Sequence, residues 1–112
     1  MHGNSPDNPF ARAYGGGAVA EESDLHNDII SYCKSKGWIY LHGSMAAATH
    51  RTLGEPDFEI LADHGRVFFV ECKSKDGKLS TDQLGFAMHA QKLGHEVHLV
   101  RSMEDFRKVV ER

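Results

Sequence analysis

The segment that most constrains the fold is the run Val-Phe-Phe-Val-Glu-Cys-Lys at residues 67–73. Side chains alternate across a β-strand, so Phe69, Glu71 and Lys73 share one face and the apolar residues between them share the other. Apolar residues on both faces are typical of a central, covered strand. Glu71 and Lys73 therefore leave the end of a buried strand, where a charge is costly unless it pairs or binds a metal ion. A Glu-x-Lys triplet alone is more often a solvated strand end.

Periodicity and capping signals predict six further elements around this strand. Leu25, Ile29 and Cys33 recur at helical spacing, and Gly37 follows as a helix stop. Ser80 with Gln83 three residues later is typical of a capping box. The predicted order is helix, three strands, helix, strand, helix, over residues 22–36, 38–42, 57–61, 67–73, 81–93, 96–100 and from 103 on. This order predicts an α/β fold with a mixed central sheet flanked by helices.

The length of 112 residues fits one domain. Residues 1–20 are rich in Gly, Pro, Asn and Ala and show no hydrophobic period, so they predict a flexible arm before a domain at residues 21–112. The longest apolar stretch is too short to span a bilayer, and the first residues lack the order of a signal peptide. We therefore expect no membrane contact, a cytoplasmic location, and two reduced, buried thiols at Cys33 and Cys72.

The formal net charge of -3 argues mildly against a nucleic-acid partner, because strong binders usually carry a basic excess. Two observations weaken this objection. Carboxylates in an active site lose their negative charge when divalent metal ions bind. The basic residues also gather around Arg51, Lys73, Lys75 and Lys78.

A second carboxylate is predicted to lie beside Glu71. The segment Gly54-Glu55-Pro56-Asp57 brings Asp57 to the start of the neighbouring strand, and proline suits the first position of a strand. Two carboxylates with a lysine form a hard-oxygen site suited to Mg²⁺ or Mn²⁺. A salt-bridged cluster without metal is the alternative.

Glu22 is the candidate for a third acid. It lies three residues before Leu25 and seven before Ile29, so it shares the apolar stripe of the first helix. Its carboxylate should point toward the sheet. The alternative is that Glu22 only interacts favourably with the helix dipole in the first turn.

Four pieces in order resemble a known family. They are Glu22-x-x-Leu25, Gly54-x-Pro56-Asp57, Phe69-Val70-Glu71-x-Lys73 and Leu79-Ser80-x-x-Gln83. Together they resemble the VRR-NUC branch of the PD-(D/E)xK nucleases, over roughly residues 21–108, and residues 96–102 are similar to its final core strand. Each piece alone is unspecific, and their order on the predicted elements gives the resemblance its weight.

The resemblance implies a metal-dependent endonuclease that acts on branched DNA, such as Holliday junctions, as a homodimer. Stand-alone members occur in phages and bacteria, which suggests a phage or mobile-element origin, and the domain also occurs in larger repair nucleases. By the same resemblance, Asp57 and Glu71 would ligate Mg²⁺ or Mn²⁺ and Glu22 would complete the acidic shell. Lys73 would orient the attacking water, and Gln83 would lie beside it. The capping box explains Gln83 equally well.

Residues 43–56 form a long predicted loop, and such loops in small domains are usually functional. We interpret Thr49, His50 and Arg51, together with His42, as phosphate contacts, with a polar, solvated loop as the alternative. Lys75 and Lys78 extend the predicted DNA-binding surface. The sequence contains no Gly-rich phosphate cradle and no zinc-ligand pattern, so neither a nucleotide cofactor nor structural zinc is expected.

Three functions remain open on this reading. The leading hypothesis is a structure-selective endonuclease for branched DNA. The second is a nuclease that cuts ordinary duplex or single-stranded DNA. The third is a module with a nuclease fold that binds DNA without cutting it, although such a module has no reason to keep a costly cluster of charges.

Overall fold

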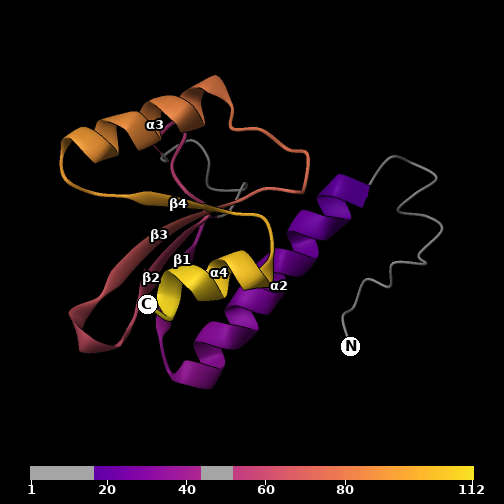
Figure 1. Ribbon diagram of the computed structural model, residues 1–112, viewed down its shortest axis with the longest axis vertical. Helices are drawn as coiled ribbons and strands as arrows, with labels where there is room; N and C mark the ends of the chain where they lie inside the picture. The colour runs from indigo at the N-terminus through magenta and orange to yellow at the C-terminus, as the bar shows by residue number, and fades with distance from the viewer. Residues whose placement is uncertain (1–16, 44–51) are drawn as a thin grey trace.

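A computed structural model describes residues 17–43 and 52–112 of the chain, with side chains from Glu22 onward in the first helix. The described residues form the predicted order of elements, with labels as in Figure 1. The helices are α2 (Gly17–Lys36), α3 (Thr81–Lys92) and α4 (Met103–Val110). The strands are β1 (Ile39–His42), β2 (Phe58–Leu61), β3 (Val67–Cys72) and β4 (Val97–Val100), with a short 3-10 turn at Asp63–Gly65. The predicted α/β class is confirmed.

The strands form one sheet in the order β1-β2-β3-β4. The two pairs β1–β2 and β2–β3 are antiparallel, and β3–β4 is parallel, so the sheet is mixed as predicted. The strand β3 lies between two others, which its apolar residues on both faces had indicated. A parallel pair needs a crossover, and α3 is the helix that returns the chain from β3 to β4.

The helices cover the two faces of the sheet unequally (Figure 1). Helices α2 and α4 pack against one face and against each other, while α3 lies on the opposite face. The hydrophobic core lies between the sheet and helices α2 and α4. In α2 its members are Leu25, Ile29 and Cys33, which confirms the predicted apolar stripe and shows that burial, rather than a disulfide, explains the cysteine. No residue of α3 is fully buried.

Side chains alternate between the two faces of β3, and this alternation determines which of them lie at the site. Val70 and Cys72 point into the core against α2 and α4, and both are buried. Phe69 and Glu71 face the other way, toward α3. In the register of β2 and β3, Phe58 pairs with Val70, so the residues just beyond this pair, Asp57 and Glu71, lie side by side. The predicted adjacency of the two carboxylates follows from this register.

Helix boundaries follow from local capping chemistry. The Ser80 side chain accepts a hydrogen bond from the Gln83 backbone N–H at the start of α3, and the two residues form the predicted capping box. Gly94, at φ +90°, follows the end of that helix as predicted. Helix α2 begins at Gly17, inside the segment 1–20 that the sequence predicts to be an arm. The remainder of that predicted arm, residues 1–16, lies outside the described residues.

In the part of the chain that the structure describes, none of the helices is both long enough and apolar enough to cross a membrane.

Candidate metal and nuclease site

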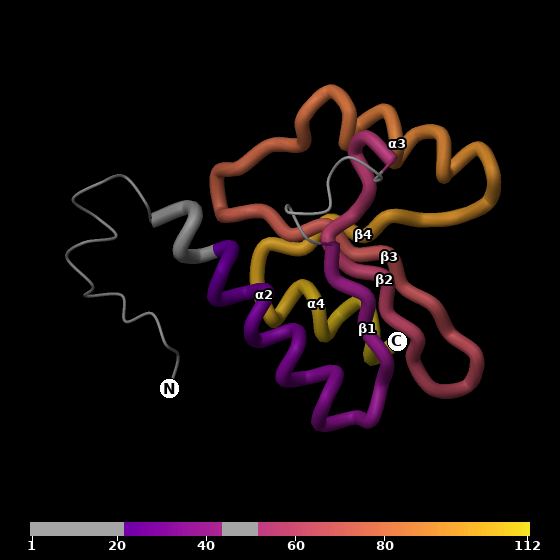
Figure 2. Tube along the Cα trace, turned by 180° about the vertical axis from the view of Figure 1, so that it is seen from behind, coloured from indigo at the N-terminus to yellow at the C-terminus, as the bar shows by residue number. Residues whose placement is uncertain are grey.

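The turn before β2 brings Asp57 to the start of that strand. Figure 2 shows the sheet from behind, with α3 on one side of it and α2 and α4 on the other. Gly54 has a φ of +78°, and a Cβ atom built on it would lie 2.1 Å from the backbone oxygen of Asp82. The first turn of α3 therefore rests directly on Gly54, which only glycine allows. This contact explains the Gly-x-Pro-Asp pattern, because it joins the turn that ends in Asp57 to the helix that carries Gln83.

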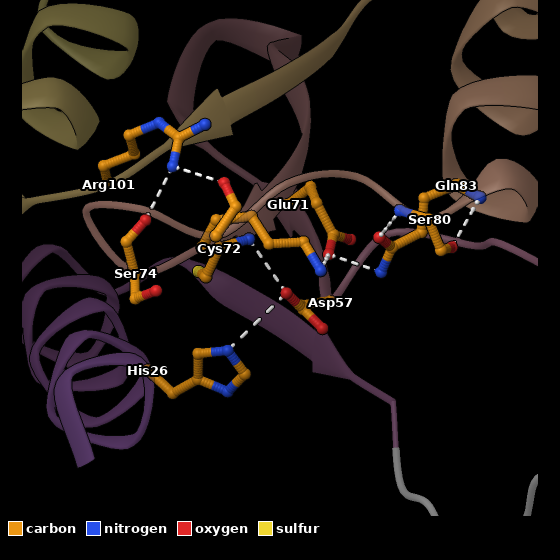
Figure 3. A network of polar contacts seen from close by, with 10 residues as sticks. His26, Asp57, Glu71, Cys72, Ser74, Ser80, Gln83 and Arg101 are labelled. Atoms are coloured by element: carbon orange, nitrogen blue, oxygen red, sulfur yellow. Dashed lines mark hydrogen bonds and ion pairs between the residues drawn. The ribbon is translucent and has the colours of Figure 1, made fainter. Parts of the chain in front are cut away.

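Asp57 is held by backbone and side-chain donors (Figure 3). Its Oδ2 atom accepts a hydrogen bond of 2.8 Å from the Cys72 backbone N–H. The His26 Nε2 atom lies 3.6 Å from the same oxygen, beyond a normal hydrogen bond but within reach of an ion pair. Burial alone would raise the pKa of Asp57, but His26, the Cys72 N–H and Lys73 outweigh it and lower that pKa. Asp57 is therefore ionised at neutral pH.

Glu71 is buried, with 3% of its surface exposed. Its Oε2 atom accepts a 2.8 Å hydrogen bond from the Gln83 side chain and lies 3.7 Å from the Lys73 ammonium. Its Oε1 atom has no hydrogen-bond partner among the described residues. Burial and the neighbouring Asp57 carboxylate raise the pKa of Glu71 to about 7, against the opposing effect of Lys73. Burying an oxygen without a hydrogen-bond partner destabilises the folded protein, and a bound cation would remove this destabilisation.

The raised pKa of Glu71 predicts how the stability of the metal-free protein depends on pH. Folding favours the protonated carboxyl, so this contribution to stability is fully present below the ordinary pKa of 4.5 and is lost as the pH rises through about 7. The contribution of Asp57 to stability depends on pH in the opposite sense. Its lowered pKa stabilises the folded protein above the ordinary pKa of 3.8, and this stabilisation is lost as the pH falls below that value. In EDTA, the free energy of unfolding should therefore fall between about pH 4.5 and about pH 7, where the folded state keeps a proton on Glu71 that the unfolded state has released.

Urea unfolding of the wild type and of Glu71→Gln at several pH values measures this slope. The glutamine can keep the contact with Gln83 but does not titrate, so its curve should be flatter. Parallel curves for the two proteins would contradict the assignment of the slope to Glu71.

Gln83 has two functions at once. Its side-chain oxygen accepts a 2.8 Å hydrogen bond from the Ser80 backbone N–H, which completes the capping box. Its side-chain nitrogen donates to Glu71, as Figure 3 shows. The sequence left open whether Gln83 caps the helix or serves the site. The structure shows that one amide does the first and reaches Glu71 as well.

The segment after Lys73 is fixed by Arg101. The Nη1 atom of Arg101 donates to the backbone oxygens of Ser74, Lys75 and Gly77 at 2.6, 3.2 and 2.7 Å. The guanidinium thus gathers three carbonyls around one cation. Lys78, at the end of this segment, is exposed. Arg101 therefore fixes the backbone from which the basic side chains predicted to bind DNA extend.

Arg101→Met should loosen this segment, because it keeps the aliphatic stem and removes all three hydrogen bonds. We expect the free energy of unfolding to fall by about 2 kcal/mol, from the usual strength of hydrogen bonds to charged groups. Amide hydrogen exchange should speed up at residues 74–78. Arg107→Met, on the exposed side of α4, is the matched control and should change neither quantity. Equal exchange in both variants would contradict the role of Arg101.

Glu22 lies at the border of this site. It is half-buried on α2, one turn before His26, and its charge helps to raise the pKa of the Cys72 thiol. The direction of its carboxylate and its place in the acidic shell stay predictions.

The other predicted DNA-binding residues divide into two groups. Thr49, His50 and Arg51 lie outside the described residues. Lys75 and Lys78 lie on the segment that follows Lys73, and both are exposed. The structure thus brings together Asp57, Glu71, Lys73 and Gln83, with Lys75 and Lys78 on the adjoining segment.

Two histidines lie together beside Asp57. His26 was not considered in the sequence analysis. The ring of His42 stacks on Phe58 with centroids 4.4 Å apart and its Nε2 atom lies 2.9 Å from His26 Nδ1, while its role as a phosphate contact stays a prediction. A signal was available, because His26 is four residues after Glu22 on the same stripe of the helix.

The residues fit a hard divalent cation. Oδ1 of Asp57 and Oε1 of Glu71 offer carboxylate oxygen, the ligand that Mg²⁺ and Mn²⁺ prefer. A second grouping, of His26, Asp57 and Cys72, has ligand atoms within 4.8 Å of one another. Burial and the carboxylates of Asp57, Glu71 and Glu22 raise the pKa of the Cys72 thiol strongly, which disfavours the thiolate that a soft metal ion needs. The carboxylate pair is therefore the better cation site.

The fold and this geometry together define a class. The mixed four-stranded sheet with helices on both faces agrees with the PD-(D/E)xK nuclease fold. In this fold, Glu71 and Lys73 lie at the end of β3 and Asp57 lies beside them at the start of β2. The particular likeness is to a solved structure described as a VRR_NUC domain. The match has a TM-score of 0.67 and 24% sequence identity, and it covers 82% of this chain and 96% of that chain.

This likeness confirms the predicted fold, and at 24% identity the fold is what it establishes. Comparisons of the sequence found no matching family model and no matching curated protein.

Proposed function

We propose that this chain is a metal-dependent DNA endonuclease that hydrolyses phosphodiester bonds, with branched DNA such as Holliday junctions as its preferred substrate. The observation that carries the proposal is the Oε1 atom of Glu71, which is buried without a hydrogen-bond partner among the described residues. Glu71 lies beside Asp57 in the sheet register, and its other oxygen, Oε2, lies 3.7 Å from the Lys73 ammonium. Most buried side-chain oxygens in folded proteins have a hydrogen-bond partner, so an oxygen without one supports a site that receives a cation.

Asp57 and Glu71 would hold one Mg²⁺ or Mn²⁺ ion, with Glu22 completing the acidic shell from α2. When bound, the ion would lower the pKa of a water molecule and neutralise charge on the scissile phosphate. The ionised Asp57 provides a permanent negative charge, and Glu71 provides a second charge once its proton has left. Metal binding should therefore release a proton from the protein near and below neutral pH.

Lys73 would orient the attacking water and stabilise the negative charge that develops on the phosphate. Its side chain is 16% exposed, so the ammonium is partly shielded from solvent and acts more strongly than a surface lysine. Gln83 holds Oε2 of Glu71, which fixes the direction of the other oxygen. No protein side chain forms a covalent bond with the substrate in this scheme.

The DNA would lie across the end of the sheet where these residues gather. Lys75 and Lys78 would contact its phosphates from the segment that Arg101 fixes. The residues Thr49, His50 and Arg51 remain predicted contacts. Each exposed lysine adds a salt-sensitive, sequence-independent contribution to affinity, which suits recognition of DNA by its shape.

A homodimer is part of this proposal. Symmetrical resolution of a four-way junction needs two cuts, and the described part of one chain offers one such carboxylate pair. Exposed apolar side chains on α3, notably Leu84 and Met88, support α3 as the dimer surface. Phe86, on the same helix, is half-buried.

A cleavage assay tests the proposal. Labelled four-way junction, flap, duplex and single strand would be incubated with Mg²⁺, Mn²⁺ or EDTA, using the wild type and Asp57→Ala. Metal-dependent cutting of the junction, lost in Asp57→Ala, is expected. Equal or better cutting of duplex or single strand would keep the nuclease and overturn the preference for branched DNA. Absence of cutting by folded protein in both metals would overturn the enzyme and favour a DNA-binding module.

A further inference from the structure

Two histidines form a chain that leads from the edge strand to Asp57. The His42 Nε2 atom on β1 lies 2.9 Å from Nδ1 of His26 on α2, and His26 Nε2 lies 3.6 Å from Asp57 Oδ2. His26 Nε2 is buried and has no hydrogen-bond partner within the described ranges. The path from α2 to the carboxylate is visible in Figure 3.

Aromatic packing fixes the orientation of both rings. Phe58 stacks on His42 and meets the edge of His26, with ring centroids 5.3 Å apart in the second contact. The two imidazoles are themselves nearly perpendicular, at 81°. Phe58 is buried, so its ring is a fixed surface for both imidazoles, of which His26 is half-buried and His42 is exposed.

The contact between the two histidines also determines which ring nitrogen carries a hydrogen. Only one of the two nitrogens in the contact between His42 and His26 can donate when both rings are neutral. If His26 donated, the lone pair of its other nitrogen would face the negative carboxylate of Asp57. If His42 donates, His26 presents an N–H group to that carboxylate, which is the electrostatically favourable arrangement.

We propose that His26 is a positioning residue for the metal site, with its Nε2–H directed at Oδ2 of Asp57 and its tautomer set by His42. The inference rests on the proposed function, because it assigns a role toward the cation that Asp57 and Glu71 would hold. Oδ2 already accepts a hydrogen bond from the Cys72 backbone N–H, and the His26 N–H would face the same oxygen from 3.6 Å. Both groups would hold Oδ2, which would leave the other oxygen, Oδ1, for the cation. Outer partners of this kind hold a ligand in its binding geometry.

This arrangement excludes His26 as a direct ligand of the same cation. A ligating imidazole must offer a lone pair, whereas the nitrogen nearest Asp57 carries the hydrogen in the favoured tautomer. His26 acts through Asp57 and touches neither the phosphate nor the water.

The test measures Mn²⁺ affinity by isothermal titration calorimetry, without DNA. His26→Phe keeps an aromatic ring against Phe58 and removes both nitrogens. His26→Gln restores an N–H donor near the position of Nε2. His98→Phe is the matched control, because His98 also packs edge-on against a phenylalanine, Phe68, but away from Asp57. Circular dichroism and thermal midpoints confirm that each variant is folded.

We expect His26→Phe to weaken Mn²⁺ binding by about tenfold or more, the usual effect of losing an outer hydrogen-bond partner. His26→Gln should recover most of this loss, and His98→Phe should bind as the wild type does. His42→Phe should show a smaller loss in the same direction. Unchanged affinity in His26→Phe, or an equal loss in His26→Gln and His26→Phe, would overturn the positioning role.

The same titration separates this inference from the proposed function. Asp57→Asn and Glu71→Gln should abolish Mn²⁺ binding if the carboxylate pair is the metal site. If they do so while His26→Phe binds normally, only the inference about His26 is wrong. If the wild type binds no Mn²⁺, the proposed function is overturned, and the role of His26 with it.

Discussion

Lys73→Met should reduce the rate of DNA cleavage by about 10³-fold, the effect of removing one preorganised donor from a site where charge develops. Methionine keeps most of the aliphatic stem of lysine, so packing beside Glu71 is preserved and only the ammonium is lost. The effect should appear in kcat, because Lys73 is partly buried beside the carboxylates and acts on the reacting group. Single-turnover cleavage of the preferred substrate measures it.

Two further measurements separate this effect from loss of metal. Lys73 lowers the pKa of both Asp57 and Glu71, so its removal makes protons compete more strongly with the cation. Mn²⁺ affinity should therefore be measured at about pH 8.5, well above the pKa of about 7 for Glu71, where proton competition is small. Binding should be retained there while cleavage is lost.

Lys78→Met is the matched control for charge, since Lys78 is exposed on the adjoining segment. It should weaken DNA binding and reduce its dependence on salt, with little change in the rate of the bound complex. A comparable loss of rate in Lys73→Met and Lys78→Met would contradict a catalytic role for Lys73 and leave it a phosphate contact.

Gly54→Ala should cause the largest loss of stability among conservative single substitutions at the site. Two costs combine: the φ of +78° is unfavourable for alanine, and its Cβ would lie 2.1 Å from the backbone oxygen of Asp82. Strain of about 1–3 kcal/mol and overpacking of a similar size lead us to expect a loss of about 3 kcal/mol or more. Chemical denaturation with and without Mn²⁺ measures it.

Gly37→Ala is a close control. Gly37 has a similar φ of +72°, but a Cβ built on it meets no atom within 4 Å. It should therefore show the backbone strain alone, about 1 kcal/mol, without the clash. Gly54→Ala should also displace α3 and weaken Mn²⁺ binding, because Gln83 would lose its position against Glu71. Equal destabilisation by the two substitutions would show that contact with α3 is not what requires Gly54.

Much of the fold could be predicted because its signals are local. Apolar residues on both faces of the strand around Val70 indicate that it is central, and the capping box at Ser80 fixes the start of α3. The start of α2 was predicted less well. The helix begins at Gly17, where composition indicated an arm, because hydrophobic periodicity marks only the part of a helix that packs against a core.

The candidate site divides in the same way. Asp57, Glu71 and Lys73 could be chosen from sequence, since alternation along one strand and a proline before the next set their positions. The oxygen of Glu71 that has no partner among the described residues could not be predicted from the sequence, because it depends on which groups the tertiary structure brings within hydrogen-bonding distance.

What the sequence determined by itself is the order of elements, the face of β3 on which Glu71 lies, and the carboxylates that begin or end strands. Each depends on spacing along a single segment. The tertiary structure alone decided that α3 rests on Gly54 and that the Gln83 amide reaches Glu71. It also brought His42 and His26 into line with Asp57, although the two histidines are 16 residues apart in the chain. Such contacts join segments whose relative placement follows from the packing of the whole domain, and no local pattern encodes it.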